Sequence, residues 1–169
     1  MKENRTRKLT LAAMTAAAYA ALSLLSAAFG ISYGPIQVRL SEALCLLPFL
    51  FPETAWGLGV GCLIANVFSP YGLPDLVVGT LATLLAALLT ARCRKLWLAA
   101  LPPVLCNAVL VGAVLTWEQT GLSAAFWPAY GLNALSLLLS EGIACGVLGV
   151  LLVKQLPRVP FFRERMSKR

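Results

Sequence analysis

Long apolar runs alternate with short polar segments along nearly the whole chain. Six such runs occupy residues 9–29, 38–51, 54–68, 76–90, 96–117 and 129–153. A helix that crosses a membrane needs about 20 mostly apolar residues, so the second and third runs are short for complete spans. They form either a tight helical hairpin or one re-entrant unit. The pattern predicts an all-α integral membrane bundle of six transmembrane helices, because helices satisfy every backbone hydrogen bond internally.

The first apolar run follows a basic stretch, as the apolar region of a signal peptide does. Lys2, Arg5, Arg7 and Lys8 precede it. Its length of about 21 residues exceeds the roughly 7–15 apolar residues of a signal peptide. We therefore expect this run to be the first transmembrane helix.

The composition agrees with a membrane protein and excludes a soluble one. Hydrophobic residues make up 59% of the chain and charged residues only 12%, against about 25% charged residues in a typical soluble domain. The six runs leave no room for a soluble domain, so residues 1–169 are expected to form a single transmembrane substrate-binding domain.

The basic residues predict how the bundle is oriented. Lys and Arg number 14 against 7 acidic residues. With six spans, every basic residue except Arg39 falls at the N-terminus, at 92–95 or in the C-terminal tail, all on one side. Positive residues mark the cytoplasmic side, which predicts an N-in and C-in topology. The positive charge is thereby explained without nucleic acid as a partner.

Several kinds of chemistry are excluded by the residues that the sequence lacks. The chain has no histidine and its five cysteines form no CxxC pair, which argues against His-based catalysis, a zinc site or a disulfide framework. An integral-membrane enzyme would need acidic clusters at the cytoplasmic face, where only Glu53 is expected. A channel would need a polar stripe along a whole helix, which the inner halves lack. We expect no enzyme activity and no metal.

A few ionisable and amide side chains interrupt the apolar runs, and such residues are usually functional. Arg39 and Glu42 are three residues apart, so a helix would place them on one face, where they can pair. Glu141 lies deep in the sixth run and needs a partner. The amides are Asn66, Asn107 and Asn133.

These polar residues all fall in the predicted outer half of the membrane or near its midplane. We expect Arg39, Glu42 and Glu141 to converge with the three asparagines in a pocket open to the outside, with Tyr130 at its wall. Alternatives remain open. The Arg39–Glu42 pair could only fix a helix end, and the asparagines could join helices. The aromatic residues could form an interfacial belt. Asp75 is expected in an outer loop at 69–75.

Small residues recur at intervals of four in the first run. They form two adjacent stripes on one helix face, namely Ala12, Ala16 and Ala20 beside Ala13, Ala17 and Ala21. Such stripes let another helix approach closely, either inside the bundle or from another subunit. Gly57 and Gly61 in the third run, and Gly142 and Gly146 in the sixth, are expected to pack internally.

Three sequence segments resemble those of the QueT family. They are YGPIQVRLSEAL at 33–44, GCLIANVFSP at 61–70 and GTLATL at 79–84. The resemblance covers essentially the whole chain. It implies a substrate-binding S component of an energy-coupling factor (ECF) transporter, a six-helix bundle of the bacterial plasma membrane that takes up queuosine precursors from outside.

The resemblance also implies partners. S components dock on a shared transmembrane T subunit that carries two ABC-type ATPases, and an alanine pattern on the first helix contacts the T subunit. Either alanine stripe matches that pattern. The chain has no G-x-x-x-x-G-K-[ST] loop, so ATP would be used by the separate ATPases and the chain itself would need no cofactor. An S component for a different small vitamin is the nearest alternative.

The implied ligand agrees with the polar residues. Queuine and its precursors are planar deazaguanines with a guanine-like donor edge and, in some forms, an amine. Glu42 or Glu141 could accept hydrogen bonds from that edge while the other holds the ammonium, since charge-assisted pairs are strong. Asn66 and Asn107 could meet the remaining donors and acceptors.

Overall fold

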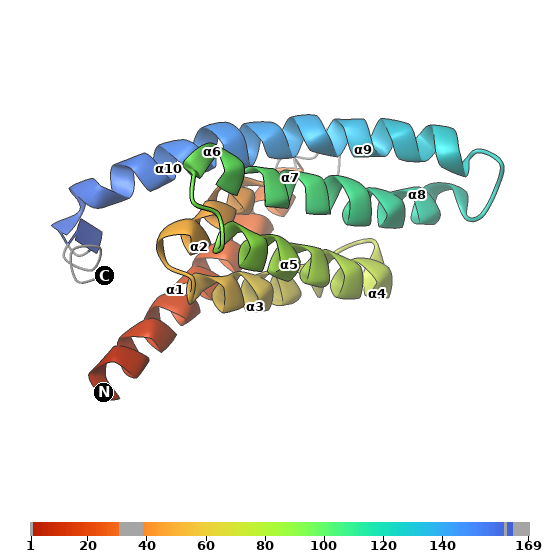
Figure 1. Ribbon diagram of the computed structural model, residues 1–169. Helices are drawn as coiled ribbons and strands as arrows, with labels where there is room; N and C mark the ends of the chain where they lie inside the picture. The colour runs from red at the N-terminus through yellow and green to blue at the C-terminus, as the bar shows by residue number, and fades with distance from the viewer. Residues whose placement is uncertain (1, 31–38, 161, 164–169) are drawn as a thin grey trace.

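The computed structural model of the chain describes residues 2–30, 39–160 and 162–163 (Figure 1). Within these ranges every regular element is helical and no strand occurs, which confirms the all-α prediction. The first half of the 33–44 segment and the end of the basic tail, including Arg165, Lys168 and Arg169, lie outside the described residues.

Four helical stretches are long and apolar enough to cross a membrane, and they make this a multi-pass membrane protein. They span Arg5–Ala28, Gly72–Thr90, Leu96–Thr120 and Phe126–Arg158. The first is α1 (Lys2–Ala28), and the second joins α4 (Gly72–Pro74), η2 (Asp75–Gly79) and α5 (Thr80–Thr90). The third joins α6 (Leu96–Ala99), α7 (Leu101–Cys106), η3 (Asn107–Val111) and α8 (Gly112–Thr120). The fourth joins α9 (Phe126–Ile143), η4 (Ala144–Gly149), α10 (Val150–Gln155) and η5 (Leu156–Arg158).

Two further helical stretches are shorter than a membrane span. One joins η1 (Leu40–Leu46) to α2 (Leu47–Leu50), and the other is α3 (Thr54–Asn66). A helix of 13 residues is about 20 Å long at 1.5 Å per residue, against about 30 Å of hydrocarbon. The described chain thus has the six predicted helical stretches, of which four rather than six are long and apolar enough to span.

The predicted loop at 69–75 is wrong in its second half. Gly72 has a φ of 63°, a conformation that glycine adopts without steric cost, and α4 begins there. Asp75 is therefore the first residue of a π-helical segment and is buried, rather than lying in an outer loop.

The long helices form a bundle around the short η1 segment. The helix pairs in contact include α1 with α3, α3 with α5, α5 with α7, and α8 with α9. The η1 segment contacts α1, α5 and η4, so it fills the space between the first and last long helices. The first residues of α1 and the end of α10 lie at the same end of the bundle (Figure 1), as the predicted topology requires.

Helices α1 and α3 pack with their backbones nearly in contact. A Cβ atom added to Gly61 would lie 2.6 Å from the Ala16 carbonyl oxygen, and one added to Gly57 would overlap the Ala12 carbonyl oxygen. Small residues on both helices allow this approach. The prediction that Gly57 and Gly61 pack internally is confirmed. It is wrong for Gly142 and Gly146, where an added Cβ atom would meet nothing within 4 Å outside the helix's own backbone.

The exposed surface has the properties of a lipid-facing one. Large apolar side chains are exposed along every long helix, whereas many buried residues are alanine, cysteine, serine or threonine. Association in a bilayer depends on close packing and polar contacts rather than on hiding apolar surface from water, which accounts for this distribution. The four tryptophans, Trp56, Trp97, Trp117 and Trp127, are all exposed near helix ends, where aromatic belts occur.

Candidate functional site

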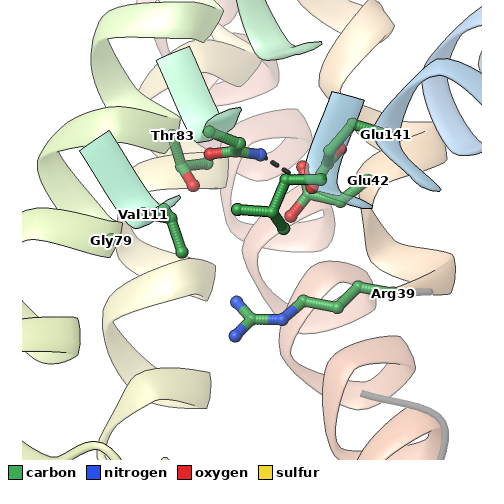
Figure 2. A pocket seen from close by; sticks show the side chains of 8 residues that line it. Arg39, Glu42, Gly79, Thr83, Val111 and Glu141 are labelled. Atoms are coloured by element: carbon green, nitrogen blue, oxygen red, sulfur yellow. Dashed lines mark hydrogen bonds between the residues drawn. The ribbon is translucent and has the colours of Figure 1, made fainter. Parts of the chain in front are cut away.

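One pocket lies among the helices and gathers polar side chains from distant parts of the sequence (Figure 2). It is lined by Arg39, Glu42, Gly79, Thr83, Asn107, Val111, Leu137 and Glu141. Of the predicted site residues, Arg39, Glu42, Asn107 and Glu141 are thus brought together. The cavity volume of about 10 Å³ holds roughly one water molecule. A larger ligand must therefore move some of the lining side chains.

Glu42 lies on η1 and is almost completely buried, with 2% of its surface exposed. The Tyr19 hydroxyl donates a hydrogen bond of 2.5 Å to Oε1, and the Cys45 thiol donates one of 3.0 Å to Oε2. These neutral donors hold the carboxylate in place without neutralising it. Tyr19 comes from α1, so the first helix helps to position the site.

Glu141 lies on α9 and is 6% exposed. The Asn107 side-chain amide donates a hydrogen bond of 2.9 Å to its Oε1 (Figure 2). The Cys145 thiol, one turn further along, lies 3.7 Å from its Oε2 and 3.3 Å from the Glu42 carbonyl oxygen. Cys145 therefore connects the two acidic residues.

The two carboxylates belong to one cluster. One ligand atom each from Glu42, Glu141 and Cys145 lie within 4.8 Å of one another. Two buried carboxylates this close repel each other unless a positive group or a proton lies between them. The set could hold a divalent cation or an organic ammonium group.

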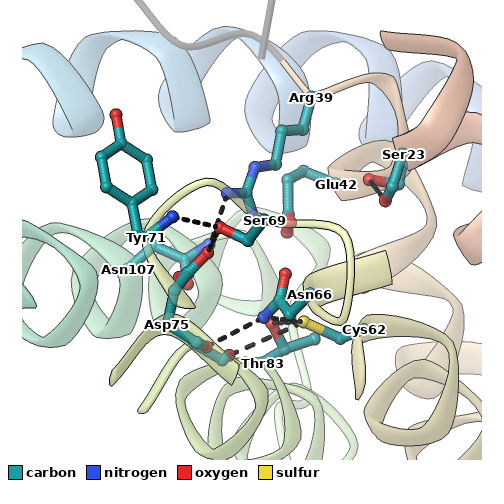
Figure 3. A network of polar contacts seen from close by, with 12 residues as sticks. Ser23, Arg39, Glu42, Cys62, Asn66, Ser69, Tyr71, Asp75, Thr83 and Asn107 are labelled. Carbon is teal, nitrogen blue, oxygen red and sulfur yellow. Dashed lines mark hydrogen bonds and ion pairs between the residues drawn. The ribbon is translucent and has the colours of Figure 1, made fainter. Parts of the chain in front are cut away.

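Arg39 forms an ion pair with Asp75 (Figure 3). The guanidinium lies 3.7 Å from Asp75 Oδ2, which also accepts a 2.6 Å hydrogen bond from the Ser69 hydroxyl. This ion pair joins Arg39 to another helix. The other oxygen of Asp75, Oδ1, is buried and has no hydrogen-bond partner.

Asn66 supports the site from behind the lining residues. Its side-chain amide donates to the Asp75 carbonyl oxygen at 3.1 Å and to the Cys62 sulfur at 3.4 Å. The Thr83 hydroxyl donates to the same sulfur at 3.3 Å (Figure 3). A Cβ atom on Gly79 would lie 2.7 Å from Asp75 Oδ1 and 2.8 Å from the Asn66 amide nitrogen. Only glycine leaves room for both groups at this wall.

Three π-helical segments lie at the level of this site, one in each of three long helices. Asp75 begins η2, Asn107 begins η3, and Glu141 lies just before η4. A π-helical turn widens the helix locally and shifts the direction of the side chains that follow, and such turns are frequent at functional sites. Their coincidence with the polar residues favours this region as the candidate functional site.

Tyr130 and Asn133 do not line the pocket. The Asn133 amide donates to Thr116 at 3.0 Å and to Gln119 at 2.9 Å, so it joins α9 to α8. The Tyr130 hydroxyl donates to the Val109 carbonyl oxygen, and its ring lies beside Phe126 and Trp127. These contacts agree with the two alternatives, namely that Asn133 joins helices and that Tyr130 belongs to an interfacial aromatic belt.

The two alanine stripes of α1 have different surroundings. Ala16 and Ala20 are buried, and Ala12 and Ala16 face α3. Ala13, Ala17 and Ala21 are exposed. Only the second stripe remains available for contact with another helix.

The sequence interpretation missed Tyr19, Thr83 and Asp75 as parts of the site. Tyr19 is the one aromatic hydroxyl within the alanine-rich run, which was the available signal. Thr83 lies in an apolar run without any distinguishing pattern. The glycine and proline residues around Asp75 indicated an outer loop rather than a buried position.

Comparison with known proteins gives a family. The sequence model of a family described as QueT transporter matches residues 9–158. The Queuosine precursor transporter QueT of Lactococcus lactis subsp. cremoris (strain MG1363) is 37% identical over 84 residues, which cover 50% of this chain and 49% of that protein. The match thus spans about half the length of this curated relative. No solved structure matches the chain significantly.

Proposed function

This chain belongs to the QueT transporter family, and from that premise we propose that it is the substrate-binding S component of an ECF importer. Its substrate is a queuosine precursor, a planar 7-deazaguanine that it binds from outside the plasma membrane. The name of the Lactococcus relative supports this substrate class. The family is one of transporters, which favours transport over an integral-membrane enzyme.

The observation that carries the proposal is the convergence of Arg39, Glu42, Asn107 and Glu141 in one buried pocket. A guanine-like ring offers N–H donors and a carbonyl acceptor on the same edge. Carboxylates accept from N–H groups, a guanidinium donates to a carbonyl, and an amide does both. Ligand sites commonly have few polar groups in an apolar setting, here supplied by Val111 and Leu137.

We predict that the purified full chain in detergent is stabilised by deazaguanines. At a free ligand concentration 100 times the Kd, binding adds about 2.7 kcal/mol to stability. For a chain of this size that corresponds to a rise of roughly 5–10 °C in the midpoint of thermal unfolding. Adenine serves as the control, because its edge presents the opposite donors and acceptors. No rise with any deazaguanine would refute the proposed substrate class.

The ECF partners of this S component are a transmembrane T subunit and two ABC ATPases, which supply the ATP hydrolysis. The docking surface is the exposed stripe of Ala13, Ala17 and Ala21 on α1. Ala12, Ala16 and Ala20 form the other stripe, which packs toward α3. This difference in exposure supports the second stripe as the docking register.

Ala17→Leu is therefore predicted to reduce co-purification of the chain with the T subunit by about tenfold or more, because close helix approach requires small side chains. Ligand binding should be unchanged, since Ala17 is exposed and is not among the residues that line the pocket. Gly146→Leu is the matched control, as Gly146 is exposed with open space around it on another helix. An intact complex with Ala17→Leu would rule out this docking surface.

A further inference from the structure

We propose that the connection between α5 and α6 binds the headgroups of anionic phospholipids in the surrounding bilayer. Its three basic residues are Arg92, Arg94 and Lys95, which we term the basic turn. The partner is a lipid with a phosphodiester headgroup and no compensating positive charge. None of the three residues lines the polar pocket, so this surface is separate from the candidate substrate site.

The basic turn is positively charged and has no acidic counterpart. All three side chains are exposed. The sequence from 76 to 117 contains no acidic residue, and within the described part of the chain none of the three residues forms an ion pair. Positive charges placed this close together repel one another unless anions approach them. The surface is therefore complementary to a negatively charged partner.

Hydrogen bonds that do not use the charged groups hold the connection in shape. The Thr90 hydroxyl donates to the Ala99 carbonyl oxygen at 3.0 Å, which ties the end of α5 to the end of α6. The Cys93 thiol lies 3.6 Å from the Leu98 carbonyl oxygen. Because the backbone is already ordered, the three cations are presented together and little further freedom is lost when a headgroup binds.

The basic turn lies where the hydrocarbon of a bilayer would end. It connects two helical stretches that are long and apolar enough to cross a membrane, one ending at Thr90 and the next beginning at Leu96. Trp97 follows directly, with 63% of its surface exposed, and tryptophans are enriched at the headgroup level. Basic residues at this depth lie among lipid headgroups, which attract them when the lipids are anionic.

The end of the last long helix adds positive charge at the same end of the bundle (Figure 1). Lys154 and Arg158 are both exposed, and within the described residues neither forms an ion pair. Val153, next to Lys154, belongs to the core cluster against which Leu96 packs. The basic turn and the last helix thus present their cations toward one membrane face, which the positive-inside rule predicts to be the cytoplasmic one.

Native mass spectrometry of the full chain in detergent tests this proposal. The two probes are dioleoylphosphatidylglycerol, which is anionic, and dioleoylphosphatidylcholine, which has the same acyl chains and no net charge. Each basic residue near an anionic surface strengthens the attraction by about fivefold, so three together should make phosphatidylglycerol bind roughly 10- to 100-fold more tightly. The triple variant Arg92→Gln, Arg94→Gln and Lys95→Gln should lower this preference by about tenfold or more.

A second triple variant, Arg5→Gln, Arg7→Gln and Lys8→Gln, is the matched control. It removes the same charge from the exposed start of α1 and should leave the preference within about twofold of its original value if the basic turn is the site. An equal loss in both triple variants would overturn the proposal, because net charge rather than this surface would then attract the lipid.

Salt provides a test that does not depend on any variant folding. Raising the concentration of ammonium acetate from about 50 mM to about 500 mM screens exposed charges, so the unmodified chain should lose most of its preference for phosphatidylglycerol. Equal binding of the two lipids at low salt would refute the proposal, and so would a preference that salt leaves unchanged. The binding of deazaguanines is measured separately, so neither result bears on the proposed function.

Discussion

Gly61→Ala is expected to destabilise the chain by about 1–3 kcal/mol, although alanine normally favours a helix over glycine. A Cβ atom at this position would lie 2.6 Å from the Ala16 carbonyl oxygen and 2.9 Å from the Tyr19 Cβ atom. The nearest obstacle is backbone, so α1 and α3 must separate. Because Tyr19 holds Glu42, the displacement should also weaken ligand binding. The measurement is the midpoint of thermal unfolding in detergent, followed by tryptophan fluorescence.

Gly142→Ala provides the matched comparison. Gly142 also lies within a helix, but nothing comes within 4 Å of a Cβ atom added there. Its replacement should be neutral or stabilise by about 0.5–1 kcal/mol through helix propensity. Equal effects of the two substitutions would show that the close contact between α1 and α3 does not limit stability.

Arg39→Met is expected to have the largest effect, a loss of about 3–5 kcal/mol, because it leaves a buried charge without its partner. Asp75 is 1% exposed, and its Oδ2 is the atom that Arg39 contacts. The uncompensated carboxylate should also loosen Ser69, which donates to it. Thermal unfolding in detergent measures the loss. Arg94→Met, which removes an exposed positive charge from a connection, should change stability by less than about 0.5 kcal/mol.

The double variant Arg39→Met with Asp75→Asn separates the contribution of the ion pair to stability from that of the other contacts of Arg39. The neutral amide can still accept the Ser69 hydrogen bond, so part of the lost stability should return. A coupling of about 1–3 kcal/mol between the two positions is expected for groups in direct contact. Additive losses would mean that Arg39 stabilises the chain through other contacts and that the ion pair contributes little.

Charge and hydropathy together predict the topology of the chain in the membrane. The distribution of Lys and Arg predicts both termini on one side, and the start of α1 and the end of α10 do lie at one end of the bundle. Which membrane face that end occupies stays a prediction of the positive-inside rule. Run length was a weaker guide to helix boundaries, since the apolar run at 76–90 belongs to a helical stretch of 19 residues that begins at Gly72.

The family motifs and the acidic residues within the apolar runs allowed part of the candidate site to be predicted. Arg39, Glu42, Asn107 and Glu141 could be proposed because polar residues are expensive in a bilayer and therefore rarely accidental. Asp75 escaped the same reasoning, since glycine and proline around it indicated a loop. Its burial follows from α4 beginning at Gly72 and turning the aspartate inward.

The sequence by itself determined the environment and the local structure: apolar runs of sufficient length require a bilayer, and helices alone satisfy their backbones there. It also determined which side chains are chemically unusual. Only the tertiary structure decided which of these meet, that Glu42 and Glu141 form one cluster while Asn133 joins two helices. It likewise decided which alanine stripe is free, because Gly57 and Gly61 contact Ala12 and Ala16, each 45 residues earlier in the chain. Periodicity describes one helix at a time, whereas partners are fixed by how separate helices pack.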